Sequence, residues 1–432
     1  MSAFSISGLS SGIDTTSLIS QLMTVAAQPQ TALKNQLSTE QSVISAYQAL
    51  NTKLTAFQAA ADAVKQASTW TSTKATSSNP AVVASTTSAA TAGSSTTFDV
   101  IQLATAQIST LSATGTVVAN PPNGIDVVDA AGTTHHLSLA DGTVDSVATA
   151  VNNAGLGIRA AVVNTDGGQV LQFTATTTGS AGAFSINGLD NAPQTLVAAQ
   201  NAKIAIGNPA AGGYTVSSSS NTFTNAIPGV TFSVGAVASG VTVSVGSDAN
   251  AISDKVKALV TAANDVLTTL GTDTGKGAIL EGNYQINSIT QSVLATVSHG
   301  DSTGSSFSSL GVQLTSSGTF AFDANAFASA YAADPAKTQA SLAGSLATSL
   351  SSLASNASTS TVSPLISSGT SHVSDLNKQI SAWDTRLADQ QTSLQKKYTA
   401  MEVALQKLQS TSTWLASTLG ALSNTNSSSS SK

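Results

Sequence analysis

The sequence predicts a multidomain α+β protein in which terminal coiled-coil helices enclose a helical-bundle domain, and that domain encloses two β-rich distal domains. Large apolar residues recur mostly every three or four positions at both ends of the 432-residue chain, as on one face of a helix. In the middle, apolar residues alternate with polar ones, as in strands. The predicted domains are 1–40 with 385–432 (a stalk with disordered ends), 41–75 with 249–384 (helical), 76–114 with 196–248 (β-rich) and 115–195 (a distal β-rich insertion).

The N-terminal part is expected to form two helices. Asp14 or Thr15 can cap the first, because its side-chain oxygen can accept from a free amide of the first turn. Proline lacks an amide proton and disfavours helix at the residue before it, so this helix should break near Pro29. A long second helix is expected from about Thr31 to Val64.

Strands are expected in the middle of the chain, interrupted by one short helix at 144–151. Asp166-Gly167-Gly168 has the composition of a hairpin turn between two of these strands. The segments 229–234 and 241–245 alternate cleanly, which predicts a strand pair with one buried face. The predicted strands cover 98–103, 127–128, 158–163, 170–173, 203–206, 214–216, 230–234 and 241–245.

Helical spacing returns at Ile252. One amphipathic helix should run to Leu270 with Gly271 as its C-cap, and a second should cover 286–297. A short strand at 320–323 should lead into another helix. Residues 340–372 are rich in Ser, Ala and Thr and show only a weak pattern, and the C-terminal helix is expected to follow them.

Apolar seams at both ends carry the strongest signal in the sequence. They contain Leu18, Leu22, Leu33, Leu37, Ile44, Tyr47, Leu54, Phe57 and Val64 at one end, and Leu376, Ile380, Trp383, Leu387, Leu394, Tyr398, Met401, Leu405, Leu408, Leu415 and Leu419 at the other. Such seams pack in a coiled coil, either within one chain or between chains, and both arrangements can hold at once. The predicted oligomerisation residues are Leu18, Leu22, Leu33, Leu37, Ile380, Trp383, Leu387, Leu394, Met401, Leu405, Leu408, Leu415 and Leu419.

Composition narrows the class of protein. Charged residues make up 9% of the chain, against about 25% in ordinary soluble proteins. So little charge suits a surface that is buried against copies or partners. The net charge of −6 argues against nucleic-acid binding, and the absence of cysteine excludes disulfides and thiol catalysis. We expect no Sec signal peptide and no membrane insertion, because the sequence has neither a basic region before an apolar core nor a long apolar run.

Candidate chemical motifs are weak. Residues 8–12 match the G-x-S-x-G nucleophile pattern, but that chemistry needs a preceding strand in a parallel sheet, and only seven residues come before Gly8. Residues 271–277 resemble a phosphate loop with the wrong spacing and with Gly277 in place of the Ser or Thr that holds magnesium. No metal-binding spacing connects the histidines, which we expect in solvated loops: His135, His136, His299 and His372. We therefore predict no catalytic residue, no metal and no cofactor.

Several segments in colinear order resemble the flagellar filament-capping family, also called FliD or hook-associated protein 2. The segments are 8–15 (GLSSGIDT), Leu22-Met23, Pro29, 46–50 (AYQAL), 147–152 (VATAVN) with 157–160 (GIRA), 221–224 (NTFT) with 227–231 (IPGVT), Phe322-Asp323, Asp334-Pro335 and Met401-Glu402. Asn201 departs from the family, which often has aspartate there. The likeness covers nearly the whole chain.

This resemblance implies a structural cap at the distal end of the bacterial flagellum, outside the cell, rather than an enzyme. It implies type III export, a homo-oligomeric ring, promotion of flagellin folding and insertion, contact with hook–filament junction proteins, and an export chaperone that binds near the C-terminus. The alternative is a surface adhesin whose distal β domains bind host mucin or glycans. An exported hydrolase is a third possibility, but no cluster of acid, base and nucleophile supports it.

Overall fold

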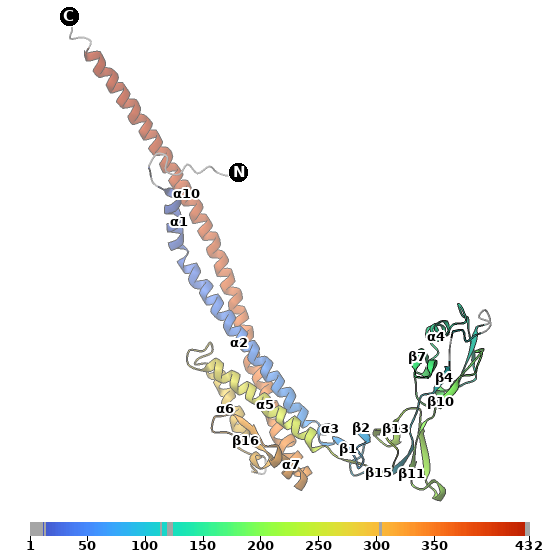
Figure 1. Ribbon diagram of the computed structural model, residues 1–432. Coiled ribbons are helices and arrows are strands. Elements are labelled where there is room, and N and C mark those ends of the chain that lie inside the picture. Colours follow the sequence, from blue (N-terminus) through green and yellow to red (C-terminus); the bar gives the residue numbers. More distant parts are fainter. Residues whose placement is uncertain (1–11, 13, 113–114, 119–123, 302–304, 428–432) are drawn as a thin grey trace. The chain divides into compact units, whose positions relative to one another are not determined.

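The computed structural model describes residue 12 and residues 14–112, 115–118, 124–301 and 305–427 (Figure 1). It divides into two compact units. The helical unit combines Met1–Gln66 with Ser253–Lys432, and the β unit is Ala67–Ile252. The α+β, multidomain fold class is confirmed, with β material inserted between two halves of a helical unit. The finer division of the helical unit near residues 40 and 385 stays a prediction.

The helical unit begins with the predicted broken pair of helices. Helix α1 (Thr15–Ala26) is capped by Asp14, whose carboxylate accepts from the Ser17 amide at 2.9 Å. Helix α2 (Gln28–Lys65) carries Pro29 in its first turn. The break is confirmed but lies before the proline, because a first-turn amide has no helical partner and proline is tolerated there.

Among the residues that the structure describes, the returning half of the helical unit contains six α-helices and a two-stranded sheet of β16 (Val312–Leu314) and β17 (Phe320–Phe322), and α6 contacts β16. The helices are α5 (Ala249–Thr274), α6 (Tyr284–Ser298), α7 (Ala324–Ala333), α8 (Pro335–Gln339), α9 (Thr348–Asn356) and α10 (Ser363–Ser427). The predicted C-cap at Gly271 is wrong, since α5 continues to Thr274 and the left-handed conformation belongs to Gly277, at φ 80°. A helical glycine costs only about 1 kcal/mol relative to alanine, and the burial of Leu270 offsets such a cost.

The segment that lacks a clear sequence pattern is helical. Two π-helical stretches, Ala340–Ala347 and Ala357–Val362, flank α9, and α10 begins at Ser363 rather than after residue 372. Leu342, Leu346 and Leu350 are buried at steps of four. Steps of four place side chains on one face of a helix, but the Ser, Ala and Thr residues between these leucines give little contrast in hydrophobicity, so the pattern is weak in the sequence. The predicted disorder from Ser423 is also wrong as far as Ser427, where α10 ends.

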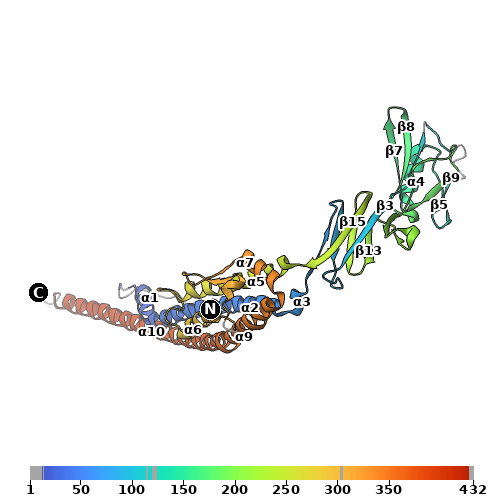
Figure 2. The same cartoon turned by 90° about the horizontal axis from the view of Figure 1, so that it is seen from below.

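Helix α2 packs against α9 and α10 to form an antiparallel hairpin (Figures 1 and 2). Four polar pairs mark its register: Asp62 with Ser351, Asn51 with Ser358, Glu40 with His372, and Gln30 with Asp384. Each step toward the N-terminus of α2 is matched by a step along the chain from α9 (Ser351) through the second π-helical stretch into α10. Hydrogen bonds from Ser351 and then Lys65 lower the pKa of Asp62. The hairpin therefore has one defined register, and α1 continues along α10 beyond it.

The β unit contains two hydrophobic clusters. The first lies between a five-stranded sheet, β1-β15-β3-β11-β12, and a three-stranded sheet, β13-β14-β2. The second joins sheets β10-β4-β8-β7 and β6-β5-β9 with helix α4 (Val144–Asn153). The strands are β1 (Thr73–Ser77), β2 (Val82–Thr86), β3 (Ser95–Gln102), β4 (Ile108–Ser112), β5 (Ile125–Asp129), β6 (Thr134–Leu137), β7 (Ile158–Thr165), β8 (Gly168–Ala175), β9 (Phe184–Asn187), β10 (Gln194–Val197), β11 (Ala202–Ile206), β12 (Tyr214–Ser218), β13 (Thr222–Ile227), β14 (Val230–Val234) and β15 (Ala238–Ser247). A short helix, α3 (Ala67–Trp70), precedes them.

Two strand predictions have different outcomes. The hairpin at Asp166-Gly167 is confirmed, with Thr165 opposite Gly168. The pairing of β14 with β15 is wrong, because β14 pairs with β13 and β2, whereas β15 pairs with β1 and β3. Their buried faces belong to one cluster between the two sheets. Alternation identifies a strand's buried face correctly, but hydrogen-bonding partners distant in sequence leave no trace in it.

Strand pairing also moves the boundary expected between residues 114 and 115. Strand β4 pairs with β8 and β10, so it belongs to the second cluster rather than to the first β-rich domain. The chain enters and leaves this distal module at an antiparallel bridge between Thr105 and Gln200, whose backbone groups exchange hydrogen bonds of 3.0 and 3.3 Å. We therefore place the module at residues 106–199.

Replacing residues 106–199 by a short glycine-serine linker is expected to leave the first cluster folded. Thr105 and Gln200 are direct neighbours, so a short linker closes the chain at small entropic cost. Thermal unfolding followed by circular dichroism should remain cooperative. Deletion of 115–195 is the control. It retains β4 without β8, and we expect this exposed strand to cause aggregation. Equal behaviour of the two deletions would contradict the revised boundary.

Candidate oligomerisation surface

The seam positions of α10 form one straight apolar stripe. At 100° per residue, the predicted residues from Leu376 to Leu419 fall within a band about 100° wide. The stripe lies on the same face of the helix as the contacts with α2 and α1. The α10 seam therefore has two parts: one that packs within the chain and one that extends past these helices.

Burial along the stripe falls steadily toward the C-terminus. Leu376 is 1% exposed and Ile380 is 8% exposed. The next five predicted residues are half-buried: Trp383, Leu387, Leu394, Met401 and Leu405. Leu408, Leu415 and Leu419 are exposed by 65%, 53% and 62%. These three leucines thus continue the spacing of the packed seam, but their side chains are exposed to solvent.

Helix α1 shows a second uncovered edge. Ile19 is buried, and α1 contacts α10. Leu18 is half-buried, Leu22 is 40% exposed and Val25 is 63% exposed, at steps of four and three that place them along one side of α1. Leu33 and Leu37 are half-buried on α2. The structure brings the predicted seam residues of both ends onto neighbouring helices, and their contact with other chains stays a prediction.

The uncovered part of α10 is unusually easy to desolvate. No charged residue occurs from Leu408 to Ser427. Five of its hydroxyl groups donate to backbone carbonyls of the same helix three or four residues back: Ser410, Thr411, Thr413, Ser417 and Thr418. Removal of water from a hydroxyl group costs little free energy when that group already donates a hydrogen bond within the protein. Burial of this surface against another helix would therefore leave few polar groups unpaired.

Three exposed apolar residues of the terminal helices are not among the predicted seam residues: Val25, Val403 and Trp414. Val403 and Trp414 lie off the predicted seam, so a search for a single stripe passes over them, whereas Val25 continues the line of Leu18 and Leu22 along α1. The charge-free run that starts at Leu408 is the signal that could have found Trp414. A surface helix usually carries charged residues on its solvent side, so a run without charge indicates that more than one of its sides is covered.

The predicted histidine environments are partly wrong. His135 and His136 lie on β6 and His372 on α10 rather than in loops. His135 pairs with Asp129 at 3.3 Å, and His136 pairs with Asp126 at 2.7 Å. The Thr133 amide and then His135 lower the pKa of Asp129 by hydrogen bonding. These are separate His–Asp pairs, and within the described ranges no group of three His, Asp or Glu side chains could hold a metal.

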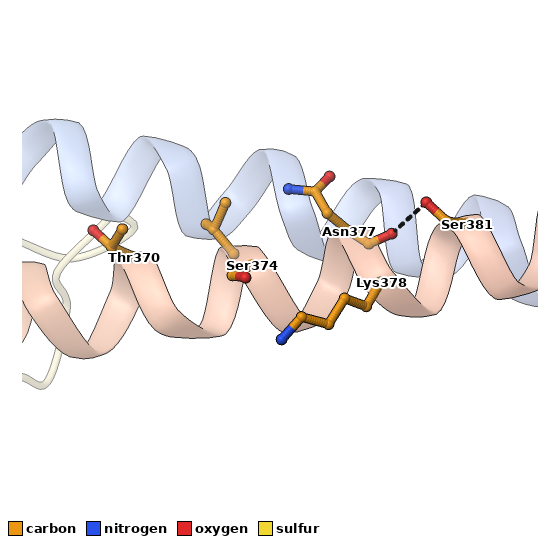
Figure 3. Close-up of a pocket in the computed structure, with 6 residues that line it drawn as sticks. Thr370, Ser374, Asn377, Lys378 and Ser381 are labelled. Atoms are coloured by element: carbon orange, nitrogen blue, oxygen red, sulfur yellow. Dashed lines mark hydrogen bonds between the residues drawn. The ribbon is translucent and has the colours of Figure 1, made fainter.

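Other features offer no convergent chemistry. A hollow of about 710 Å³ on α10 is lined by Thr370, Val373, Ser374, Asn377, Lys378 and Ser381, and Figure 3 shows them along one helix. Its one charged group, Lys378, is paired with Asp375 at 2.9 Å. The serine of the G-x-S-x-G pattern lies outside the described residues. Among the helices that the structure describes, none is long and apolar enough to cross a membrane.

Two family models match the chain. The N-terminal model of flagellar hook-associated protein 2 matches residues 11–107, and the C-terminal model matches residues 199–410. Together they cover well over half of the sequence, and they leave out the distal module. The chain belongs to the flagellar hook-associated protein 2 family.

Individual relatives agree with this family. Flagellar hook-associated protein 2 of Escherichia coli strain K12 is 27% identical over 249 residues, 52% of each chain, and the protein of E. coli O157:H7 gives the same values. The chain thus spans about half the length of the curated relatives it matches. The crystal structure of the flagellar cap protein FliD D1-D2-D3 domains from E. coli is similar at a TM-score of 0.54 and 26% identity, over 75% of this chain and 99% of that one. This similarity supports the nested arrangement of helical and β-rich domains in the hook-associated protein 2 family.

Proposed function

We propose that this protein is a structural cap at the distal end of the bacterial flagellar filament. In this role it forms a homo-oligomer and promotes the folding and insertion of exported flagellin subunits. Membership of the hook-associated protein 2 family supports the role. The observation that carries it is the α10 stripe, which is buried at Leu376 and uncovered from Leu408 onward. Exposed leucines that continue the spacing of the seam do not stabilise a monomer, whereas an assembly can bury them against another chain.

The copies are proposed to meet through the terminal helices. The oligomerisation surface consists of the thirteen seam residues predicted above, from Leu18 to Leu37 and from Ile380 to Leu419. The same proposal places the protein outside the cell, at the flagellar tip. Its further partners would be the hook–filament junction proteins and an export chaperone that binds near the C-terminus. No cofactor and no catalytic step is part of this function.

The adhesin alternative has less support. None of the relatives reported above is described as an adhesin. The pocket at Asp129 and His135 has a volume of about 340 Å³. Asp129 already accepts from the amides of Ala131 and Thr133 and pairs with His135. The hydrogen bonds of Asp129 therefore stabilise the turn between β5 and β6.

Deletion of the gene separates the two functions. A strain without the cap is expected to lack filaments and to release unpolymerised flagellin into the medium, which electron microscopy and immunoblotting would show. Expression of the full chain from a plasmid should restore filaments. Normal filaments and swimming in the deletion strain, with loss of attachment to host mucin alone, would overturn the cap and favour the adhesin.

A further inference from the structure

The distal module contacts the rest of the β unit at more than its two chain crossings. The crossings lie side by side at the bridge between Thr105 and Gln200. A further connection comes from residues 178–180, in the loop that follows β8. This loop reaches the turn between β12 and β13 and the residue before β11, which belong to the sheets of the first cluster. We call residues 178–180 the joint loop.

Three side-chain hydrogen bonds attach the joint loop to the first cluster's sheets. Thr178 Oγ1 donates to the backbone carbonyl of Ser219 at 2.9 Å. The amide of Ser180 donates to Asn201 Oδ1 at 2.8 Å, and the Ser180 hydroxyl donates to the same oxygen at 3.2 Å. The two ends of the joint loop are thus bonded to two different segments outside the distal module.

Gly179, in the middle of the joint loop, makes the closest approach. It is buried, its φ is 91°, and its amide donates to the carbonyl of Thr105 at 3.1 Å. A Cβ atom on this residue would lie 2.5 Å from the carbonyl oxygen of Ser219 and 2.9 Å from Asn201 Oδ1, closer than real Cβ contacts. Both the backbone conformation and the close contact therefore require glycine.

The turn that receives the joint loop is itself anchored. Asn221 Oδ1 accepts from the amide of Ala104 at 2.7 Å, and Asn221 Nδ2 donates to the carbonyl of Ala104 at 3.1 Å. This side chain pairs with the backbone as one residue of a neighbouring strand would. The carbonyl of Asn221 also accepts from the amide of Val234 at 2.8 Å. The joint loop therefore closes onto a fixed surface.

Two adjacent chain crossings alone would form a hinge, and relative motion is the usual behaviour of domains that share little surface. A third attachment to a different segment opposes that motion. We propose that the joint loop is a latch that makes the distal module and the first cluster move as one rigid body, with Gly179 as the residue that lets it close. The latch acts within one chain and does not depend on the assembly of copies.

Spin labels can measure this rigidity in the full chain, because the sequence has no cysteine of its own. Val83→Cys on β2 and Val163→Cys on β7 place one label on each module, at residues that are 71% and 37% exposed. Double electron–electron resonance should give one narrow distance distribution. Dilution with unlabelled chain keeps distances between copies out of the measurement.

Gly179→Ala is expected to open the latch. The added methyl group cannot fit against Ser219, so the joint loop must move away and the hinge becomes free. The distance distribution should broaden at least about twofold, as expected for domains in relative motion.

Gly212→Ala is the matched control. Gly212 has nearly the same φ, 92°, but nothing lies within 4 Å of its added Cβ, so this variant has the same backbone strain without the contact. Its distance distribution should stay narrow. Equal broadening in this control would assign the effect to strain and overturn the latch.

Thr178→Val with Asn201→Ala tests the latch without added bulk, and it decides the question if Gly179→Ala fails to fold. It removes the Thr178 donor and the acceptor of Ser180, so the distribution should broaden again. Asn201→Asp alone keeps the acceptor and should stay narrow. A narrow distribution in the folded Gly179→Ala protein or in the double variant, or a broad one in the unsubstituted chain, would overturn the latch.

Discussion

Cells whose only copy of the protein carries Leu405→Asp with Leu408→Asp are expected to export it, release flagellin into the medium and lack filaments. Leu405 is half-buried and Leu408 is 65% exposed, so the single chain can tolerate both charges. In an assembly both positions would be buried, and burial of an unpaired carboxylate costs about 3 kcal/mol or more. Two such charges in each copy should weaken every contact by at least about 100-fold.

Immunoblots of medium and cells, together with electron microscopy, would measure this effect. Val83→Asp with Tyr284→Asp is the matched control. It places the same two charges at residues that are 71% and 82% exposed and far from the terminal seams in the sequence. Control cells should swim. If the Leu405 and Leu408 variant swims as well, the terminal helices do not hold the cap together.

Phe232→Ala is expected to destabilise the β unit by about 3–5 kcal/mol, the usual cost of truncating a buried phenylalanine. Phe232 is 1% exposed, and its ring stacks on Phe98 at 4.9 Å and on Phe223 at 5.3 Å. The substitution would leave a cavity between the two sheets of the first cluster. Total stabilities of domains are only about 5–15 kcal/mol, so this loss is a large fraction.

Urea unfolding followed by tryptophan fluorescence can isolate this unit. Trp70 is the one tryptophan of the β unit, so Trp383→Phe with Trp414→Phe leaves a local probe. Val83→Ala is the control on the neighbouring β2 strand, where the side chain is 71% exposed, and its effect should stay within about 0.5 kcal/mol. A loss below about 1 kcal/mol in Phe232→Ala would show that the ring does not belong to a fixed core.

Local sequence patterns predicted much of this fold. The broken N-terminal helices, the helices near 144–151 and 252–270, and the hairpin at Asp166-Gly167 follow from local rules of spacing, capping and turn composition. The same rules placed the leucines of α10 on one face. A residue's own helix or strand determines these properties, so a short stretch of sequence contains the information.

Pairing and packing between segments that are distant in sequence became known only from the tertiary structure. Packing determines which sheets contain β14 and β15, to which module β4 belongs, and where the π-helical stretches on either side of α9 form. Leu376 and Leu415 illustrate the limit for the candidate surface. Both occupy the same helical stripe, yet one is 1% exposed and the other 53%. Side-chain spacing determines which face of α10 is apolar, but the position where α1 and α2 stop covering that face determines where it remains available to another chain.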